Sequence, residues 1–504
     1  MRRRVGFSRS SSGWETAAGV VSRVRVVVIG CGHVGLPTGL AFALTGHSVA
    51  FVDSSRATLD RAAAGQSPSR EPGVVEALRA TGSRVSFEAD LERALPGAEV
   101  ALVAVGTPLA AGSPGGVSVA DIERVVRDLA RATRVPAPVV ALKSTVPPGT
   151  TRSVSDRLQA LRPDLAWAVA ANPEFLRMGQ ALPDALRPSR IVIGTESGEA
   201  WSRLRGLYRD ITRGEFAWPA FLSAPRPAGP VPVVWTDPES AEVSKLAANT
   251  FLAARVSLVN EVANVCDLVG ADVADVARIV GLDSRVGPDF LEAGLGYGGS
   301  CLPKDVALFA HFAKKAGHHL AVAQAIAVVN DAQRSVVLEK LERLLGGGGV
   351  GGVRVALLGL AFKPGTDDDR GSLGWALVAD LVARGASVSA HDPVVRPQDG
   401  EPAEGLRPTV KTCATPEEAL TGADGAILAT AWAEYVDLDW GHVARLMRRP
   451  VLVDGRNALD PGRMAALGFT YAGVGRGRPP RPRVPTGIVA AGPGAEEGPG
   501  HGGE

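Results

Sequence analysis

A glycine-rich loop that ends in a cysteine is the stretch of this sequence best suited to chemistry. It reads Gly-Leu-Gly-Tyr-Gly-Gly-Ser-Cys-Leu-Pro-Lys-Asp, with Cys301 as its cysteine. Glycine lets a backbone turn tightly and approach a ligand closely, and a cysteine reacts as its thiolate, which nearby cations favour. The loop therefore indicates a nucleophilic thiol presented to a ligand. From this run alone a buried structural cysteine is an equal alternative, because free cysteine is among the most buried residue types.

A lysine and an asparagine form a second candidate pair. Lys245 and Asn249 lie four residues apart in a long helical pattern that begins at Pro238, and residues at this spacing share one helix face. Ala247-Ala248 and Phe251-Leu252 surround them, which predicts a partly buried lysine rather than a solvated surface stripe. A buried lysine beside an amide can stabilise a developing oxyanion.

These side chains need a cofactor site near them, and the start of the chain predicts one. A β-branched strand at residues 24–29 leads into Gly30-Cys-Gly32-His33-Val34-Gly35, then a helix, a second strand and Asp53. This order is the dinucleotide-binding fingerprint, in which the pyrophosphate sits on the helix N-terminus. Asp53 would accept hydrogen bonds from the ribose hydroxyls and repel a 2′-phosphate, so the pattern favours NAD over NADP.

Polar residues follow the next strands of the same predicted sheet. Thr107 ends one strand, Ser144 and Thr145 end another, and Glu174 follows a third. Each alone is more typical of a turn or helix cap. Because ligands bind beyond the carboxyl ends of parallel strands, we expect the four to line one site.

A second strand–helix–strand pattern starts after the glycine run 346–352. It carries Lys363, Arg370 and Arg456 but no GxGxxG motif, so it should bind a different partner. Lys363 and Arg456 follow strands, and they and Arg370 are candidates to bind a diphosphate.

Composition limits the remaining possibilities. Among the 504 residues the net charge is +1, and the four cysteines are scattered with no CxxC pair. These features argue against nucleic-acid or membrane-surface binding, a disulfide framework or a metal site. No apolar stretch is long enough to span a membrane and no signal peptide is evident, so we expect a cytoplasmic protein.

The fold class expected is α/β, with two Rossmann-like doubly wound domains joined by a long central helix and an all-α middle domain. We place a disordered extension at 1–22, a NAD-binding domain at 23–230, a helical dimerisation domain at 231–345, a second Rossmann-like domain at 346–474, which the resemblance described next assigns to a UDP-sugar, and a disordered tail at 475–504.

Taken together, the motifs resemble the nucleotide-sugar 6-dehydrogenase family, also called the UDP-glucose/GDP-mannose dehydrogenase family. In order along the chain they are the Gly30 fingerprint, Lys143-Ser-Thr-Val-Pro-Pro-Gly-Thr, Asn172-Pro-Glu-Phe-Leu-Arg, Glu242-x-x-Lys-x-x-Ala-Asn, the cysteine loop, Gly359-Leu-Ala-Phe-Lys and Asp454-Gly-Arg. They extend from about residue 24 to residue 473, which is nearly the whole chain apart from its tails.

The resemblance implies the oxidation of a sugar alcohol to a carboxylate by two NAD⁺, with UDP-glucose as the substrate. It implies that Lys245, with Asn249 and Asp305, manages the alcohol proton and that Cys301 captures the aldehyde. Glu174 would then be the general base of thioester hydrolysis, with Thr145 ordering the water.

The resemblance also implies ligand contacts and a homodimer or larger homo-oligomer. Cofactor contacts would come from the fingerprint residues and from Thr107, Ser144, Thr145, Met178, Lys304 and Arg370. Substrate contacts would come from Glu174, Phe175, Leu176, Arg177, Lys245, Asn249, Phe290, Leu291, Gly294, Gly296, Tyr297, Gly298, Phe362, Lys363 and Arg456, and Arg285 would reach the site of a neighbouring subunit.

A few positions depart from the family pattern. Met178 replaces a usual glutamate, Leu302 a common phenylalanine and His33 a usual aromatic residue. Met178 puts cofactor affinity and the fine shape of the sugar pocket in question. The alternative within the family is a GDP-mannose or UDP-N-acetylhexosamine 6-dehydrogenase. The cysteine loop argues against a plain two-electron hydroxyacid dehydrogenase, and the presence of Cys301, Lys245 and Asn249 argues against a non-catalytic nucleotide-sugar sensor.

Overall fold

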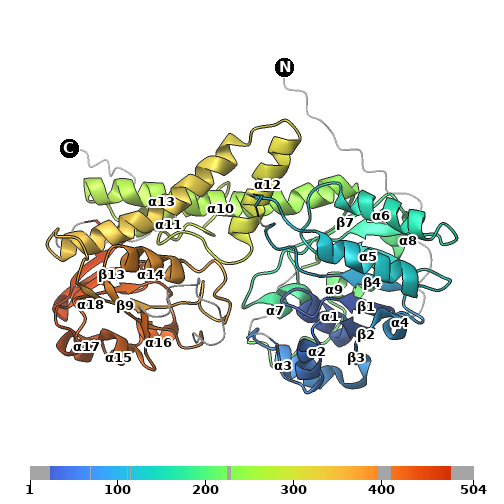
Figure 1. Ribbon diagram of the computed structural model, residues 1–504, viewed down its shortest axis with the longest axis horizontal. Coiled ribbons are helices and arrows are strands. Elements are labelled where there is room, and N and C mark those ends of the chain that lie inside the picture. Colours follow the sequence, from blue (N-terminus) through green and yellow to red (C-terminus); the bar gives the residue numbers. More distant parts are fainter. Residues whose placement is uncertain are drawn as a thin grey trace, which may run out of the picture. The chain divides into compact units, whose positions relative to one another are not determined.

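The computed structural model describes residues 23–68, 70–110, 112–113, 115–223, 229–395 and 410–477. The chain divides into two compact units, residues 1–247 and 248–504, and each is built on its own sheet (Figure 1). The α/β fold class expected from the sequence is confirmed. The extension 1–22 and the first half of the linker at 225–232 lie outside the described residues.

In its described residues the first unit has an eight-stranded sheet of order β3-β2-β1-β4-β5-β6-β7-β8. All neighbours are parallel except β6 and β7. The strands are β1 Arg25–Ile29, β2 Ser48–Val52, β3 Val85–Glu88, β4 Val100–Val103, β5 Val139–Leu142, β6 Val169–Ala171, β7 Ile191–Gly194 and β8 Val233–Thr236. Because β8 pairs with β7, this sheet extends past the boundary expected at residue 230.

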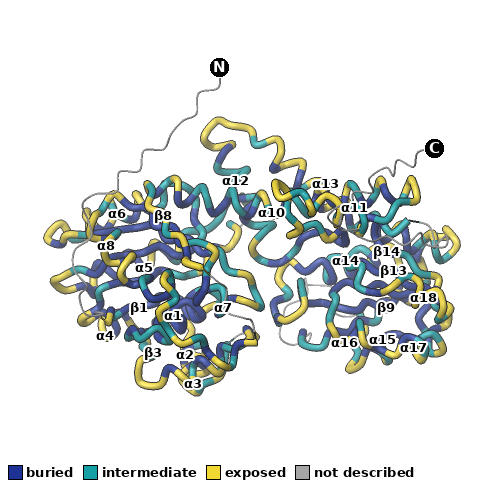
Figure 2. The backbone as a smooth tube through the Cα atoms, turned by 180° about the vertical axis from the view of Figure 1, so that it is seen from behind, coloured by how far each residue is buried: buried dark blue, intermediate teal, exposed yellow. Residues whose placement is uncertain are grey.

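Helices cover both faces of the first sheet. One apolar core joins the sheet to α1 Gly35–Leu44, α2 Arg56–Ala63, α3 Val74–Thr81, α7 Ala181–Leu186, α8 Gly198–Leu207 and α9 Arg209–Arg213. The opposite core joins it to α4 Leu91–Ala94, α5 Ala120–Ala132 and α6 Thr150–Leu161. A short 3₁₀ turn, Gly82–Arg84, follows α3. The buried Val/Ala/Leu strands between these layers appear dark blue in Figure 2.

The second unit has, in its described residues, a six-stranded parallel sheet of order β11-β10-β9-β12-β13-β14. The strands are β9 Arg354–Leu358, β10 Ser387–His391, β11 Val410–Thr412, β12 Gly425–Leu428, β13 Val451–Asp454 and β14 Thr470–Gly473. One face is covered by α15 Pro416–Leu420, α16 Ala433–Val436, α17 Trp440–Leu446 and α18 Pro461–Ala466. The other face packs on α14 Leu373–Ala383 and on the helices described next.

Part of the predicted all-helical region packs directly on this second sheet. It comprises α10 Pro238–Val269, α11 Val273–Gly281, α12 Leu302–Lys315 and α13 Ala321–Leu344. Val259 and Ala263 of α10 and Val337 and Leu341 of α13 share one apolar core with β9 and β13. The glycine run after α13 lies within this unit, and its Gly352 N–H donates to the Gly385 carbonyl. The division into three domains stays a prediction.

The start of the expected C-terminal tail is held in place. Gly475 accepts a hydrogen bond from the Val273 N–H at 2.7 Å, its own N–H donates to Asp267, and Arg476 pairs with Asp272 at 3.2 Å. The ordered chain therefore continues to at least Gly477, past the residue at which composition places the tail. Residues 478–504 lie outside the description.

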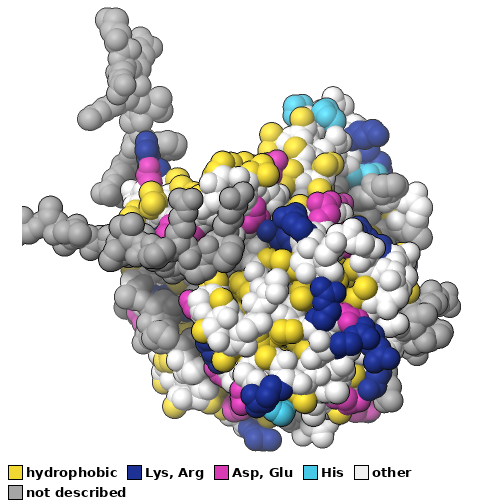
Figure 3. Space-filling model, turned by 90° about the vertical axis from the view of Figure 1, so that its left-hand side faces the viewer, with side chains coloured by type: hydrophobic (Ala, Val, Ile, Leu, Met, Phe, Trp, Pro, Cys, Tyr) yellow, Lys and Arg dark blue, Asp and Glu magenta, His cyan; other side chains and the backbone are white. Residues whose placement is uncertain are grey.

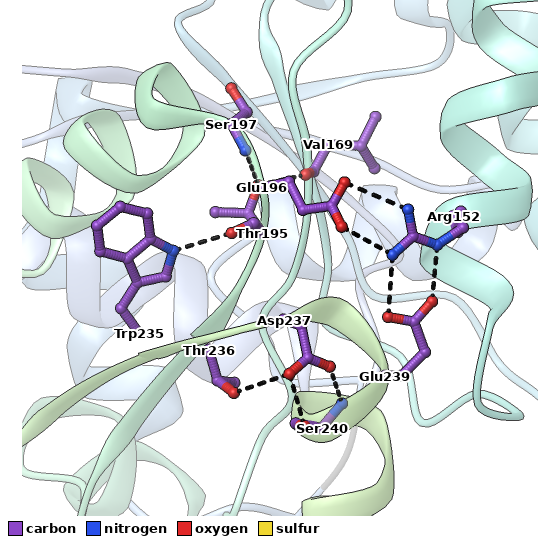
Figure 4. Close-up of polar contacts among 10 residues, drawn as sticks. All are labelled: Arg152, Val169, Thr195, Glu196, Ser197, Trp235, Thr236, Asp237, Glu239 and Ser240. Atoms are coloured by element: carbon purple, nitrogen blue, oxygen red, sulfur yellow. Dashed lines mark hydrogen bonds and ion pairs between the residues drawn. The ribbon is translucent and has the colours of Figure 1, made fainter.

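Helix α10 begins in a polar network at the edge of the first sheet. Asp237 accepts hydrogen bonds from the Ser240 N–H and hydroxyl, both at 2.7 Å. Arg152 of α6 joins Glu239 of α10 and Glu196, and the Trp235 indole donates to the Thr195 carbonyl at 2.9 Å (Figure 4). These contacts fix where α10 starts.

A second, buried contact joins α10 to α6. The Glu242 carboxylate accepts from the Gly149 N–H at 2.6 Å, the Thr151 N–H at 2.7 Å and the Thr151 hydroxyl at 2.6 Å. Burial raises the pKa of Glu242 above its usual value in spite of these donors. Glu242 thus closes the N-terminus of α6 and sets the depth of Lys245, one helical turn further along α10.

We predict that Glu242→Ala lowers the free energy of unfolding by about 2 kcal/mol or more, because two buried N–H groups lose their acceptor. Glu239→Ala, one turn earlier on the same helix, should cost less than about 1 kcal/mol, because its ion pair with Arg152 is exposed. Urea-unfolding midpoints of the two variants test this. Equal losses would contradict the role given to Glu242.

Candidate active site

The first glycine turn has the geometry of a dinucleotide site. Gly30 has a φ of +103°, and a Cβ there would lie 2.4 Å from the Ala104 carbonyl oxygen. At Gly32 a Cβ would meet no atom within 4 Å, so the turn is open there. No side chain caps the N-terminus of the ten-residue helix α1, which leaves this end suited to an anion.

Asp53 supports this turn from the end of β2. One carboxylate oxygen accepts from the Cys31 N–H at 2.7 Å and the other from the Ser55 N–H at 2.8 Å. Each oxygen retains acceptor capacity for a ribose hydroxyl. Cys31 itself is buried, and burial, reinforced by the Asp53 charge, raises the pKa of its thiol to about 12, so it is not a nucleophile.

The polar residues at the ends of β4 and β5 come together as expected. The Thr107 hydroxyl donates to the Thr145 carbonyl at 2.8 Å, and the Ser144 hydroxyl donates to the Val105 carbonyl at 2.7 Å. Ser144 and Thr145 also line a small cavity, together with Lys245, Glu242 and Pro173. The rim of the first sheet therefore brings the fingerprint loop's neighbours beside the lysine of α10.

At the centre of this half lies a buried ion pair. The Lys245 ammonium is 2.8 Å from a Glu174 carboxylate oxygen, and the two side chains are only 4% and 8% exposed. The Leu176 N–H also donates to Glu174. Burial by itself would raise the pKa of Glu174, but Lys245, the Leu176 N–H and Lys143 together bring it below its usual value. Glu174 is therefore held as a carboxylate.

Phe175 lies between two cations. The Arg190 guanidinium is 3.5 Å from its ring centroid, and the Lys245 ammonium is 5.6 Å from it. Such cation–π contacts fix the ring that the sequence places in the sugar site. Arg190 was not among the residues selected from the sequence, because an arginine before a strand looks like an ordinary surface cation.

In the second unit, buried amides hold the glycine loop by its backbone. Asn260 accepts from the Gly294 N–H at 2.8 Å, and Gln333 donates to the Gly294 carbonyl at 3.0 Å. Asn330 accepts from the Tyr297 N–H and donates to the Tyr297 carbonyl. These contacts hold the backbone of the loop in place. Gly296 has a φ of +102°, a conformation that glycine adopts readily.

Cys301 follows this loop and is exposed, with its sulfur free of any disulfide. The alternative of a buried structural cysteine is therefore wrong. Cys301 is the N-cap residue of α12, where the helix dipole favours an anionic thiolate. The Ser300 hydroxyl lies 3.9 Å from the sulfur and contacts Asp368 and Arg370. The pKa of Arg370 is raised, mainly by its hydrogen bond to Asp368 and further by nearby negative charge, although burial lowers it.

Asp305 is buried in the first turn of α12. One oxygen accepts from the Asn249 amide at 2.6 Å and the other pairs with the Lys304 ammonium at 2.7 Å. Asn249 and Asp305 are therefore brought together, as expected, while Lys304 is engaged with Asp305. Helix α10 carries Lys245 and Asn249 four residues apart, on either side of the boundary between the units.

The other predicted contact residues occupy varied positions. The Arg456 guanidinium donates to the Ala429 carbonyl at 2.7 Å and to the Gly296 carbonyl at 3.2 Å. Arg177 forms three hydrogen bonds with Asp184, and Arg285 is exposed beside Asp283. The remaining residues, all partly buried, are Met178, Leu176, Phe290, Leu291, Gly298, Phe362 and Lys363.

Sequence patterns did not identify two further buried charged residues, Glu71 and Lys143. Glu71 accepts from the Gly179 N–H at 2.9 Å and the Ala181 N–H at 2.6 Å, which fixes the start of α7 beside residues 174–178. Lys143 is buried at the end of β5 and contacts Asn172 and Tyr208. The motifs around Lys143 contain it, but nothing in a single sequence shows that its ammonium is buried.

Within the described residues no cluster of His, Cys, Asp or Glu could hold a metal ion, and no helix is long and apolar enough to cross a membrane. On the face shown in Figure 3, basic side chains lie in separate groups with acidic ones beside them.

The first unit has the sheet and the glycine turn of a dinucleotide-binding domain, and the second unit repeats the α/β plan without that turn. Family models agree: the NAD binding domain of the UDP-glucose/GDP-mannose dehydrogenase family matches residues 24–212, its central domain 239–332 and its UDP binding domain 356–461. The chain belongs to this family and is an NAD-dependent oxidoreductase.

Three relatives show how similar this chain is to other members of the family. A UDP-glucose 6-dehydrogenase of Pseudomonas aeruginosa is 39% identical over 90% of this chain and 98% of its own. The structure of a UDP-glucose dehydrogenase from Pyrobaculum islandicum matches with a TM-score of 0.80 and 35% identity, over 91% of this chain and 99% of that one. A UDP-D-ManNAc dehydrogenase from Pyrococcus horikoshii matches with a TM-score of 0.76 and 26% identity, over 90% and 100%.

Proposed function

We propose that this enzyme oxidises UDP-glucose to UDP-glucuronate in two NAD-dependent steps through a covalent bond to Cys301. The observation that carries the proposal is an exposed thiol at the N-cap of α12, at the end of a glycine loop whose backbone is fixed by buried amides. A two-electron alcohol dehydrogenase has no use for such a nucleophile. Bound NAD⁺ supplies the hydride acceptor in both oxidations.

In the first oxidation the sugar C6 alcohol loses a hydride and a proton and becomes an aldehyde. Lys245 and Asn249 stabilise the oxygen as its negative charge develops, because a buried ammonium and amide act strongly where water is excluded. The family resemblance assigns the transfer of this proton to Lys245, with Asn249 and Asp305, and the proton passes to solvent. The Lys245–Glu174 pair keeps the ammonium in one orientation while this happens.

The second oxidation begins when the Cys301 thiolate attacks the aldehyde carbon and the oxygen takes up a proton, which gives a thiohemiacetal. The thiohemiacetal then loses its hydroxyl proton to solvent and a second hydride, which a fresh NAD⁺ would accept, and becomes a thioester. Water then adds to the thioester carbon, Glu174 takes the proton of that water, and the C–S bond breaks to return the thiolate. Thr145, on the rim beside Lys245, helps to order the water.

Two observations favour UDP-glucose over other nucleotide sugars as the substrate. The relatives of higher identity are named UDP-glucose dehydrogenases, and the segment Asn172 to Arg177 followed by Pro188 to Gly194 resembles that branch more than the others. The second candidate is a UDP-N-acetylhexosamine, as acted on by the Pyrococcus relative by its name. A cytoplasmic location stays a prediction.

With a panel of nucleotide sugars and excess NAD⁺, we expect two NADH per UDP-glucose and little turnover of GDP-mannose or UDP-N-acetylhexosamines. The reason is that the covalent intermediate is oxidised before it leaves the enzyme. Absorbance at the NADH band and chromatography of the product measure this. A ratio of one NADH per sugar would rule out the covalent route.

Cys301→Ala should stop acid formation, because neither thiohemiacetal nor thioester can form, and the rate should fall by about 10³-fold or more. Cys413→Ala is the matched control, because Cys413 is also partly accessible but is not part of the glycine loop. Its charged neighbours are Lys411 and Glu418. Product analysis distinguishes the two variants. Acid formation by Cys301→Ala at the wild-type rate would refute the nucleophile.

We also propose a homodimer through the long helix α10 and its neighbour α11. Phe251, Leu258, Val265 and Leu268 are 57–85% exposed and recur along one side of α10, and Ile279 of α11 is 61% exposed. A large exposed apolar stripe of this kind marks an interface. Arg285, exposed after α11, would extend toward the partner.

Leu258→Glu should shift the protein toward monomers, because a carboxylate buried in an apolar interface has no partner. Leu161→Glu on the exposed side of α6 is the matched control and should leave the mass unchanged. Size-exclusion chromatography with light scattering measures both. A wild-type chain that is monomeric at micromolar concentration would contradict the dimer.

A further inference from the structure

The site described above gives no role to the buried charge of Lys143 in the first unit. It follows β5 and its residue is only 7% exposed. Within the described part of the chain no carboxylate lies within ion-pair distance of it. A buried ammonium without such a partner is costly to the fold, so its presence needs a reason.

The contacts of Lys143 are neutral. Its ammonium donates to the Asn172 side-chain oxygen at 3.3 Å and to the Tyr208 hydroxyl at 3.1 Å. Tyr208 in turn donates to the same Asn172 oxygen at 2.7 Å, and the Asn172 amide donates to the Val192 carbonyl at 2.8 Å. An ammonium has three donors, and two acceptors are provided.

This network ends beside Glu174. Asn172 precedes Glu174 by two residues, and its own N–H donates to the Leu142 carbonyl at 2.8 Å. The charged groups that act on Glu174 are Lys245 of α10 and Lys143, with the neutral Tyr208 beside Lys143. Lys245 therefore contacts this carboxylate directly, and Lys143 adds a second positive charge from beyond ion-pair distance.

We propose that Lys143 is a positioning residue that acts on the reaction through Glu174, by holding Asn172 and by adding a second positive charge that keeps the base ionised. This inference rests on the proposed role of Glu174 in thioester hydrolysis. Lys143 does not touch the reacting atoms. Its effect is on the pH range in which Glu174 can accept a proton from water.

Electrostatics agree with this assignment. Burial, partly offset by Glu174 and reinforced by Lys245, lowers the pKa of Lys143 to about 8. A lysine whose pKa is lower in the fold than in the unfolded chain destabilises the fold in full below its folded pKa, and the penalty declines as pH rises from the folded to the unfolded pKa. Lys143 thus reduces stability at neutral pH, as functional charges often do.

Replacing Lys143 should therefore separate stability from chemistry. Lys143→Met fills a similar volume without the charge and leaves Asn172 and Tyr208 bonded to each other, so thermal stability should be unchanged or higher. Without the second cation the pKa of Glu174 rises, and the acid limb of thioester hydrolysis should move up by about one pH unit. Lys143→Gln, which keeps a polar head, should shift the limb in the same direction.

Tyr208→Phe is the matched control, because it breaks the same network but keeps the charge. Its acid limb should stay in place. The measurement is the pH dependence of steady-state NADH formation, with the Cys301 adduct quantified by intact-protein mass spectrometry after acid quench. The inference is overturned if neither Lys143 variant moves the limb, or if Tyr208→Phe moves it as far.

Glu174→Gln separates this inference from the function on which it rests. If Glu174 is the base, this variant accumulates the covalent adduct at every pH. Accumulation there, with an unmoved limb in Lys143→Met and Lys143→Gln, would overturn only the role of Lys143. Normal hydrolysis by Glu174→Gln would overturn the base itself.

Discussion

The buried ion pair between Glu174 and Lys245 is the interaction on which the first half-site depends. Two charges removed from water are tolerated only with close geometry and further hydrogen bonds. The 2.8 Å contact supplies the first requirement, and the Leu176 N–H supplies part of the second. The surrounding fold must hold a strand-end loop and a helix at fixed separation. Glu242 does so from α10, by closing the N-terminus of α6.

The second unit solves a different problem, which is to keep a thiol accessible on a loop whose backbone is buried. Buried backbone groups need partners, and glycines offer no side chains to supply them. Asn260, Asn330 and Gln333 provide those partners from α10 and α13. The helical region therefore has a structural role beyond any oligomer contact, because its polar core residues shape the loop that ends at Cys301.

Much of this architecture follows from local sequence patterns. The fingerprint, the strand-end residues Thr107, Ser144 and Thr145, and the exposed thiol are predictable because each depends on a short motif with a known backbone geometry. The burial of Lys245 was also predicted, but partly for a wrong reason, since Phe251 is largely exposed. The partners of Lys245 come from distant segments. The roles of Glu71, Arg190 and Lys143 likewise depend on contacts between residues far apart in sequence, which periodicity cannot reveal.

On the proposed mechanism the two members of the ion pair are needed in different steps. Lys245 acts while an oxygen gains negative charge, and Glu174 acts later by taking a proton. When Glu174 is protonated, Lys245 loses its counter-charge, and two buried cations then face a neutral acid. That state favours return of the proton to solvent, because the electrostatic cost falls only when the carboxylate is restored. An excess of buried positive charge therefore lowers the stability of the fold. On the proposed mechanism it also favours deprotonation of Glu174 after each hydrolysis.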